Sequence, residues 1–196
     1  MRLASFSVSG HEGFGIVTDD GIIELTGRLS GRQQTLRDAL EADVLEEAAQ
    51  ISLDADVDYG HGDVEWRLPV PDPEKIYCVG QNYAAHITEM GYELPEYPSI
   101  FARFPRTFVP HHGSMVMPSH SEHFDYEGEL TIVIGTEARH VSEADAFNYV
   151  AGYTVCNDGS VRDWQKRGPQ VAPGKNWEYS GMLGPWITTA DEAGDP

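Results

Sequence analysis

The stretch DYEGELTIVIG, residues 125–135, decides how the rest of the sequence is interpreted. Two glutamates, Glu127 and Glu129, stand two positions apart at the head of a run rich in β-branched residues. Because successive side chains of a strand point to opposite faces, both glutamates would lie on the same face. Two like charges on one face repel each other unless a cation or a proton lies between them. The pair therefore predicts either a cation site or a solvated acidic face.

A third acid, Asp158, follows in the segment NDGS, residues 157–160. Three carboxylates that converge on one point would suit a hard divalent cation such as Mg²⁺ or Mn²⁺. The alternative is ordinary, because Glu-x-Glu is frequent on the solvated face of an edge strand and this chain is rich in acids. Taken alone, the spacing favours the solvated face, and further residues have to decide.

Composition places the chain among folded, acidic proteins. Its 196 residues suffice for one sizeable domain, or for a domain with a small subdomain, and 40% are hydrophobic. The formal net charge of −19 argues against nucleic acid and anionic membrane surfaces as partners. No apolar run is long enough to span a bilayer, and no signal-peptide core is present. Two cysteines, Cys78 and Cys156, do not make a disulfide framework, so we expect inert thiols and a cytoplasmic setting.

The first 68 residues predict a small N-terminal α/β domain. Residues 14–25 predict a hairpin with an Asp-Gly turn. A helical pattern then runs from residue 35 to residue 48, with Thr35 and Asp38 placed as a capping box. The proline-rich residues 69–73 predict an extended linker, after which a second domain spans residues 74–196.

The second domain is expected to be β-rich with short helices, which makes the chain an α+β protein. Six elements are predicted in it: a buried strand at 75–80, a short helix at 84–90, a strand at 130–134, a helix at 142–149 capped by Ser142 and Asp145, a strand at 150–156, and a strand at 187–189 that runs into a turn.

A histidine and a glutamate on the short helix suggest proton transfer. His86 and Glu89 are three residues apart, so they share a helix face. A carboxylate beside an imidazole holds its tautomer and raises its basicity, so that the pair could take a proton from water. A surface His–Glu contact without a role is the simpler alternative for this pair alone.

Two cationic positions could serve a negatively charged substrate. Lys175 lies in a Gly- and Pro-rich loop, where it could stabilise an enolate or be a solvated loop lysine. Arg103 could bind a substrate carboxylate in bidentate fashion or lie on the surface. Arg162 and Asp163, in contrast, are expected to pair with each other or to cap a helix.

The ordered set of segments from about residue 75 onward resembles the fumarylacetoacetate hydrolase family. The similar segments are IYCVGQNYAAH at 76–86, EMG at 89–91, DYEGEL at 125–130, VAGYTVCND at 150–158, RD at 162–163, GK at 174–175 and LGPW at 183–186. A match of roughly 120 residues in order is more specific than any single motif.

The resemblance implies a fold and a set of roles. The fold would be the mixed β-sheet roll of this family, preceded by the small N-terminal domain. The implied metal ligands are Glu127, Glu129 and Asp158, with Mg²⁺ or Mn²⁺ as the cofactor. The implied catalytic residues are His86 and Glu89, which would activate water, and Lys175, which would assist at the developing enolate. Arg103 and Tyr83 are expected to contact the substrate.

Three residues and the length depart from the family pattern. Arg103 stands where the family usually has a lysine, Asn176 replaces a serine, and Gly159 replaces a larger residue. Family members normally continue past an Asp-Pro such as residues 195–196. We therefore expect the C-terminal part of the family core to be missing, which would leave an open sheet edge.

The implied function is a metal-dependent hydrolase that cleaves a carbon–carbon bond in an acylpyruvate-type β-diketo acid, as in aromatic-compound catabolism. A decarboxylase, hydratase or isomerase of 2-oxo acids on the same scaffold is the alternative. An inactive fragment that acts as an assembly module is a second alternative. The resemblance also implies a homodimer whose ligand is a small 2-oxo acid.

Overall fold

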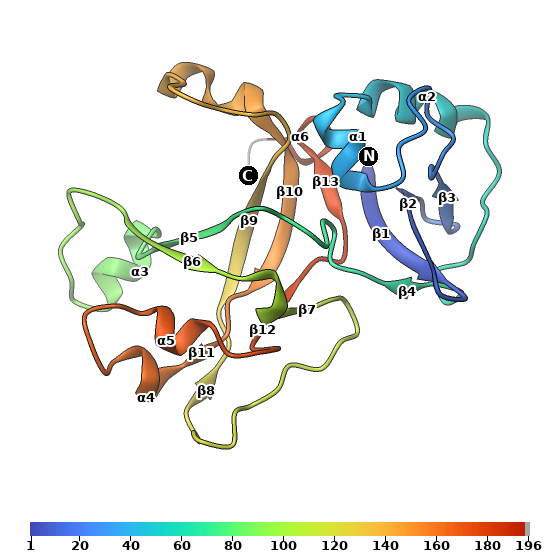
Figure 1. Cartoon of the computed structure of the whole chain (residues 1–196). Helices are drawn as coiled ribbons and strands as arrows, with labels where there is room; N and C mark the ends of the chain where they lie inside the picture. Colours follow the sequence, from blue (N-terminus) through green and yellow to red (C-terminus); the bar gives the residue numbers. More distant parts are fainter. Residues whose placement is uncertain (195–196) are drawn as a thin grey trace.

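A computed structural model gives the fold and describes residues 1–194 (Figure 1). The strands are β1 (Arg2–Val8), β2 (His11–Val17), β3 (Ile22–Glu24), β4 (Glu65–Trp66), β5 (Ile76–Gly80), β6 (Ser99–Arg103), β7 (Phe108–Val109), β8 (Phe124–Asp125), β9 (Gly128–Ile134), β10 (Val150–Asn157), β11 (Ser160–Val161), β12 (Gly181–Leu183) and β13 (Ile187–Thr189). The helices are α1 (Leu36–Glu41), α2 (Leu45–Asp54), α3 (Ala84–Glu89), α4 (Arg162–Gln165), α5 (Ala172–Lys175) and α6 (Ala190–Ala193), with 3₁₀ helices η1 (Pro105–Thr107) and η2 (Glu143–Tyr149). No helix within residues 1–194 combines the length and the apolar content that crossing a bilayer requires.

A nine-stranded mixed sheet organises the molecule, as expected for a β-rich α+β protein. Its strand order is β3-β2-β1-β13-β10-β12-β7, with β4 added on β1 and β9 on β10. The pairings are antiparallel except for β12 with β7, which is parallel. Strands β5 and β6 form a separate two-stranded ribbon that carries α3 between them (Figure 1).

The N-terminal strands and helices enclose an apolar core. The predicted hairpin is confirmed, because β2 and β3 pair antiparallel across residues 18–21. Leu3 of β1, Phe14 of β2 and Leu36 of α1 are buried in one cluster with Ile187 of β13. Sheet and helices thus share a core to which β13, from far along the sequence, also contributes.

The predicted long helix is wrong in its extent. Thr35 and Asp38 do form the expected capping box, but α1 ends at Glu41. Asp43 has a φ of 53°, a left-handed conformation that an α-helix cannot contain, and α2 starts again at Leu45. The break gives α2 a direction of its own, and Ala48 on α2 still packs into the core.

The sheet crosses the predicted boundary between the domains. Strand β13 pairs with β1 through Arg2↔Thr188 and Leu3↔Ile187, and with β10 on its other side. The expected linker contains no helix or strand, yet its Pro69 is fully buried and accepts a 2.7 Å hydrogen bond from Ser5 Oγ. The two-domain division stays a prediction, and one continuous sheet runs across it.

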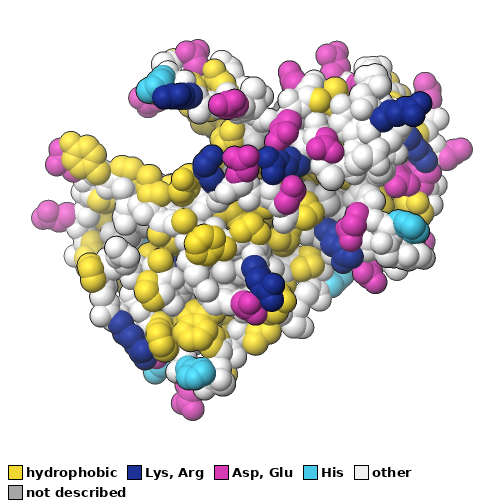
Figure 2. Space-filling view, in the orientation of Figure 1, with side chains coloured by type: hydrophobic (Ala, Val, Ile, Leu, Met, Phe, Trp, Pro, Cys, Tyr) yellow, Lys and Arg dark blue, Asp and Glu magenta, His cyan; other side chains and the backbone are white. Residues whose placement is uncertain are grey.

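Strand β5 is present where the sequence predicts it, but it is not buried. Tyr77 and Val79 of β5 are exposed, whereas the residues between them are partly covered. The reason is that β5 pairs only with β6 within the described residues, so the ribbon has one covered face and one open face. Figure 2 shows hydrophobic side chains over the left and the centre of this view, where Figure 1 places β5, β6 and α3.

The segment 142–149 is helical but not an α-helix. Residues Glu143–Tyr149 form the 3₁₀ helix η2, and Ser142 makes no side-chain hydrogen bond to a backbone N–H. Instead, Ser142 Oγ donates to Asp145 Oδ2 at 2.6 Å. The two capping residues satisfy each other, so the predicted capping box does not form.

Strand β9 lies at an edge of the sheet. It pairs with β10 alone among the described residues, and Leu130, Ile132 and Ile134 on one face are each about half exposed. Further along, β13 is confirmed, but the expected turn after it is the short helix α6. Asp195 and Pro196 lie outside the described residues.

Candidate metal centre

The register of β9 and β10 brings two of the predicted metal ligands together. Cys156 pairs with Glu129 and Asn157 pairs with Gly128. The next position of this antiparallel ladder places Asp158 beside Glu127. Asp158 N donates to Glu127 O at 2.8 Å, which fixes the two backbones at this end of the ladder. The side chain of Asp158 is buried, and that of Glu127 is partly covered.

Lys175, the last residue of α5, lies between these two acids. Its Nζ is 2.7 Å from Glu127 Oε2 and 2.6 Å from Asp158 Oδ2, and it also donates to Asp158 O at 2.8 Å. The lysine side chain is 2% exposed. A solvated loop lysine is therefore excluded, and the ammonium instead neutralises two carboxylates that the strands force together.

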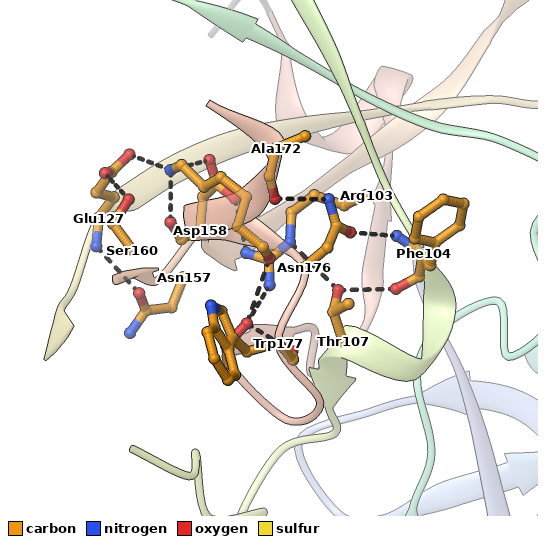
Figure 3. A network of polar contacts seen from close by, with 12 residues as sticks. Arg103, Phe104, Thr107, Glu127, Asn157, Asp158, Ser160, Ala172, Asn176 and Trp177 are labelled. Carbon is orange, nitrogen blue, oxygen red and sulfur yellow. Dashed lines mark hydrogen bonds and ion pairs between the residues drawn. The ribbon is translucent and has the colours of Figure 1, made fainter. Parts of the chain in front are cut away.

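Two arginines hold the other oxygens of the same carboxylates. Arg103 Nη1 is 2.7 Å from Asp158 Oδ1, and Arg162 Nη1 is 2.6 Å from Glu127 Oε1. Ser160 Oγ also donates to Glu127 Oε1 at 2.6 Å. Figure 3 shows Glu127, Ser160, Asp158 and Arg103 in this network of polar contacts. Five charges thus alternate in sign through the site.

The three acids differ in their electrostatic environment. Burial alone would raise the pKa of Glu127, but the hydrogen bonds from Lys175 and Ser160 outweigh it and lower the pKa. The pKa of Glu129 is raised, first by burial and then by the negative charge of Glu127, with a smaller contribution from Asp158. A hydrogen bond with Tyr83 opposes that rise. Glu129 is therefore the acid whose charge the protein neutralises least.

The donor set suits a hard cation in its chemistry. All three predicted ligands are carboxylates. Burial, and after it the negative charge of Glu127, raises the pKa of Glu129, and a bound divalent cation would stabilise the charged carboxylate against both. Among residues 1–194, however, no three His, Cys, Asp or Glu side chains converge closely enough to form a ready-made metal centre. The ammonium of Lys175 takes the central position between Glu127 and Asp158. The residues fit a cation in charge and atom type, with Lys175 supplying positive charge in the present arrangement.

His86 and Glu89 share one face of α3, as predicted. His86 Nδ1 lies 3.6 Å from Glu89 Oε2, and the side chains are 64% and 81% exposed. No hydrogen bond or ion pair within the described chain joins either residue to the carboxylate cluster. Tyr83, at the N-terminus of α3, provides the connection, because its hydroxyl accepts from Leu130 N at 3.5 Å.

Arg103 has different surroundings from those expected of a substrate-binding group. Its side chain is 0% exposed, and its guanidinium faces protein atoms. Cys78 and Cys156 are partly buried, and burial, as the leading cause, raises the pKa of each thiol to about 12. Both thiols therefore stay protonated at neutral pH, as expected for inert cysteines.

The predicted pairing of Arg162 with Asp163 is wrong. Arg162 contacts Asp125 at 2.8 Å as well as Glu127, whereas Asp163 accepts a hydrogen bond from Ser121. The helix α4 begins at Arg162 and directs successive side chains to different sides, so neighbours in sequence find different partners. The hydrogen bond from Ser160 to Glu127 is not predicted from the sequence, because a lone serine in a short strand carries no sequence signal.

Comparison with known proteins assigns most of the chain. Residues 75–196 match the model of the fumarylacetoacetate (FAA) hydrolase C-terminal family. A mitochondrial oxaloacetate tautomerase of Homo sapiens is 34% identical over 100% of this chain and 65% of its own length. A 4-hydroxyphenylacetate degradation bifunctional isomerase/decarboxylase of Salmonella dublin is 40% identical over 65% of this chain and 30% of its own. The chain thus spans less than two thirds of either relative.

Solved structures agree with the fold. A fumarylacetoacetate hydrolase from Exiguobacterium antarcticum has a TM-score of 0.78 at 28% identity, over 100% of this chain and 69% of its own. A maleylpyruvate hydrolase from Sphingobium sp. SYK-6, in complex with manganese(II) ion and pyruvate, has the same TM-score and identity, over 100% of this chain and 70% of its own.

Proposed function

The chain belongs to the fumarylacetoacetate hydrolase family, and we propose that it hydrolyses a carbon–carbon bond of an acylpyruvate-type β-diketo acid with a divalent cation at Glu127, Glu129 and Asp158. The observation that carries the proposal is the convergence of Glu127 and Asp158 on one buried ammonium, with the unneutralised Glu129 beside them. A structural neighbour in complex with manganese and pyruvate supports the same chemistry. Mn²⁺ and Mg²⁺ are the cations that such an oxygen set prefers.

The cation would act as a Lewis acid on the 2-oxo group of the substrate. Within the chain, His86 takes a proton from water, with Glu89 fixing the imidazole tautomer. The hydroxide adds to the distal carbonyl carbon, and the bond between that carbon and the methylene then breaks. The electron pair passes to the pyruvate part as an enolate, whose methylene carbon finally takes up a proton. The products are one carboxylic acid and pyruvate.

Lys175 contributes positive charge where the negative charge develops. Its ammonium is buried and already oriented by three oxygens, so little reorganisation is needed during the reaction. The net charge of −19 opposes an anionic substrate at long range, but salt screens that field beyond about 8 Å. The local cations therefore determine whether the substrate binds.

A tautomerase or decarboxylase acting on a 2-oxo acid such as oxaloacetate is the second candidate function. It is favoured by a relative of Homo sapiens whose match covers the whole chain, which is an oxaloacetate tautomerase. Both reactions need the stabilised enolate, but neither needs an activated water. The need for an activated water separates the two candidates, whereas the presence of His86 and Glu89 does so only weakly, because tautomerisation also uses a proton-transfer group.

The test compares Mn²⁺ binding by calorimetry with turnover on acylpyruvates, oxaloacetate and unsaturated 2-oxo acids. We expect Glu127→Gln to lose both metal binding and turnover. We expect His86→Ala to keep its Mn²⁺ affinity and to lose hydrolysis. Full hydrolysis by His86→Ala rejects His86 as the base, and wild-type tautomerisation or decarboxylation without hydrolysis favours the second candidate. No turnover of any substrate favours an assembly module, the remaining alternative from the sequence.

The expected homodimer and cytoplasmic setting stay predictions. The absence of nucleic-acid and membrane partners is likewise a prediction from the charge of the chain.

A further inference from the structure

Arg103 is a fully buried cation with three side-chain partners from three parts of the chain. Its Nη1 donates to Asp158 Oδ1 at 2.7 Å and its Nη2 to Ser180 Oγ at 2.8 Å. Its Nε donates to Thr107 Oγ1 at 3.2 Å. The guanidinium carbon also lies 4.4 Å from the centre of the Phe108 ring. Residues from η1, from the end of β10 and from the start of β12 are thus held by one planar group.

The contact with Arg103 occupies one carboxylate oxygen of Asp158 and leaves the other facing the proposed cation site. Oδ1 is bound by Arg103, whereas Oδ2 faces Lys175 at 2.6 Å. A carboxylate held on one side by a rigid fork cannot rotate freely about its last bond, so Oδ2 keeps its direction. Loss of a group that orients a metal-binding carboxylate in this way typically lowers metal affinity by about 10- to 100-fold.

The packing around Arg103 suits a guanidinium and not an ammonium. A lysine is a point charge with a single nitrogen, so it cannot span partners as far apart as Asp158, Ser180 and Thr107. The guanidinium also packs tightly against the backbone at Gly181, where an added Cβ would lie only 2.9 Å from Arg103 Nη1. The absence of a side chain at Gly181 leaves the space that the fork occupies.

We propose that Arg103 is a positioning residue that orients Asp158 for cation binding through its three-way fork, and not a residue that contacts the substrate. This inference rests on the proposed metal site. It replaces the substrate contact expected from the sequence with an indirect role, since a side chain with no exposed surface cannot reach a substrate from its present position.

The experiment measures Mn²⁺ affinity by calorimetry in the full chain, with thermal melting as a check on folding. The variants are Arg103→Met, which removes the charge, and Arg103→Lys, which keeps the charge without the fork. Arg106→Met is the matched control, because Arg106 is an exposed arginine that pairs with Glu178. We expect Arg103→Met to weaken Mn²⁺ binding by about 10-fold or more. Arg103→Lys should recover only part of that loss, and Arg106→Met should bind as the wild type does.

Each outcome decides one point. Wild-type Mn²⁺ affinity in Arg103→Met overturns the positioning role, and wild-type affinity in Arg103→Lys overturns the need for the fork. If Arg103→Met does not fold, Ser180→Ala removes the acceptor of Nη2, together with the hydrogen bonds from Ser180 Oγ to Lys175 O and Trp177 O. Unchanged Mn²⁺ affinity in that variant overturns the proposal. A wild type that binds no Mn²⁺, or a Glu127→Gln variant that binds it unchanged, rejects the proposed function itself. Those results are distinguishable from a failure confined to Arg103.

Discussion

Strands β1 and β9 have the same length and belong to the same sheet, yet they are held in place by different forces. Strand β1 is buried on both faces from Leu3 to Ser7, whereas β9 alternates between partly covered and exposed residues. The first is fixed by apolar packing against α1, β2 and β13. The second is fixed by its ladder to β10 and by the charged residues that gather at its start. The comparison shows that the core and the site are stabilised by separable means.

The largest expected effect separates the two strands directly. We expect Phe6→Ala on β1 to lower the free energy of unfolding by about 3–5 kcal/mol, because Phe6 is 1% exposed and its removal leaves a cavity. Ile132→Ala on β9 should cost less than about 1 kcal/mol, since half of that side chain is already in solvent. Urea unfolding followed by circular dichroism measures both. Equal losses would contradict the difference between the strands.

The second prediction concerns the charges at the start of β9. Lys175→Met leaves Glu127 and Asp158 facing each other without their shared cation. Removal of one partner from a buried ion pair typically costs about 3–5 kcal/mol. We expect a loss near the lower value at pH 7, since Glu127 is partly exposed. Saturating Mn²⁺ should restore more stability to this variant than to Phe6→Ala, which is the control.

A smaller effect is expected where α1 covers β1. Thr35 Oγ1 accepts a hydrogen bond from Asp38 N at 3.1 Å and caps the helix. Thr35→Ala should therefore lower the free energy of unfolding by about 1 kcal/mol. Its Mn²⁺ affinity should remain that of the wild type, because the cap touches only the N-terminal core. A change in metal binding would show that core and site are coupled.

The smallest effect is a difference in pH dependence between two acids. The pKa of Glu129 is raised above its ordinary 4.5, so its contribution to stability is present at low pH and lost as the pH rises through the raised value. Asp58 behaves oppositely. The hydrogen bond from Arg28 lowers its pKa below 3.8, so its contribution is present at neutral pH and lost as the pH falls through the lowered value.

Two conservative variants test this opposition. Glu129→Gln should stabilise the fold at pH 7 and have little effect below pH 4, where the wild-type carboxyl is protonated. Asp58→Asn should destabilise at pH 7, with a smaller difference at pH 3. Urea unfolding at both pH values measures the four changes. If both variants changed the free energy of unfolding at pH 7 in the same direction, the opposite pKa shifts of Glu129 and Asp58 would be contradicted.

Local features of the fold could be read from the sequence, but their environment could not. The hairpin turn and the Thr35 cap depend on a few adjacent residues, and both are present. The exposure of β5 and the end of α1 at Glu41 depend on which segments cover them, and on a left-handed Asp43 that has no strong local signal.

The site shows the same limit. Glu127, Asp158 and Lys175 were placed together from their order in family-like segments, and the structure brings them within hydrogen-bond distance. The burial of Arg103 could not be foreseen, because its partners lie up to 77 positions away, and two of them, Thr107 and Ser180, belong to no motif.

The double pairing of β13 has a consequence for the order in which the chain can fold during synthesis. Thr188 pairs with Arg2 on one side and with Tyr153 on the other, so β1 meets the rest of the sheet only through residues made much later. The β1–β2 hairpin can close early, and β4 then covers Phe6 and Ser7 on the other edge of β1, but Arg2 and Leu3 on that edge wait about 170 residues beyond β2 for β13. Until that moment its apolar residues have no complete cover. A newly made chain should therefore be vulnerable to mispairing at Arg2 and Leu3 of β1 until β13 is made.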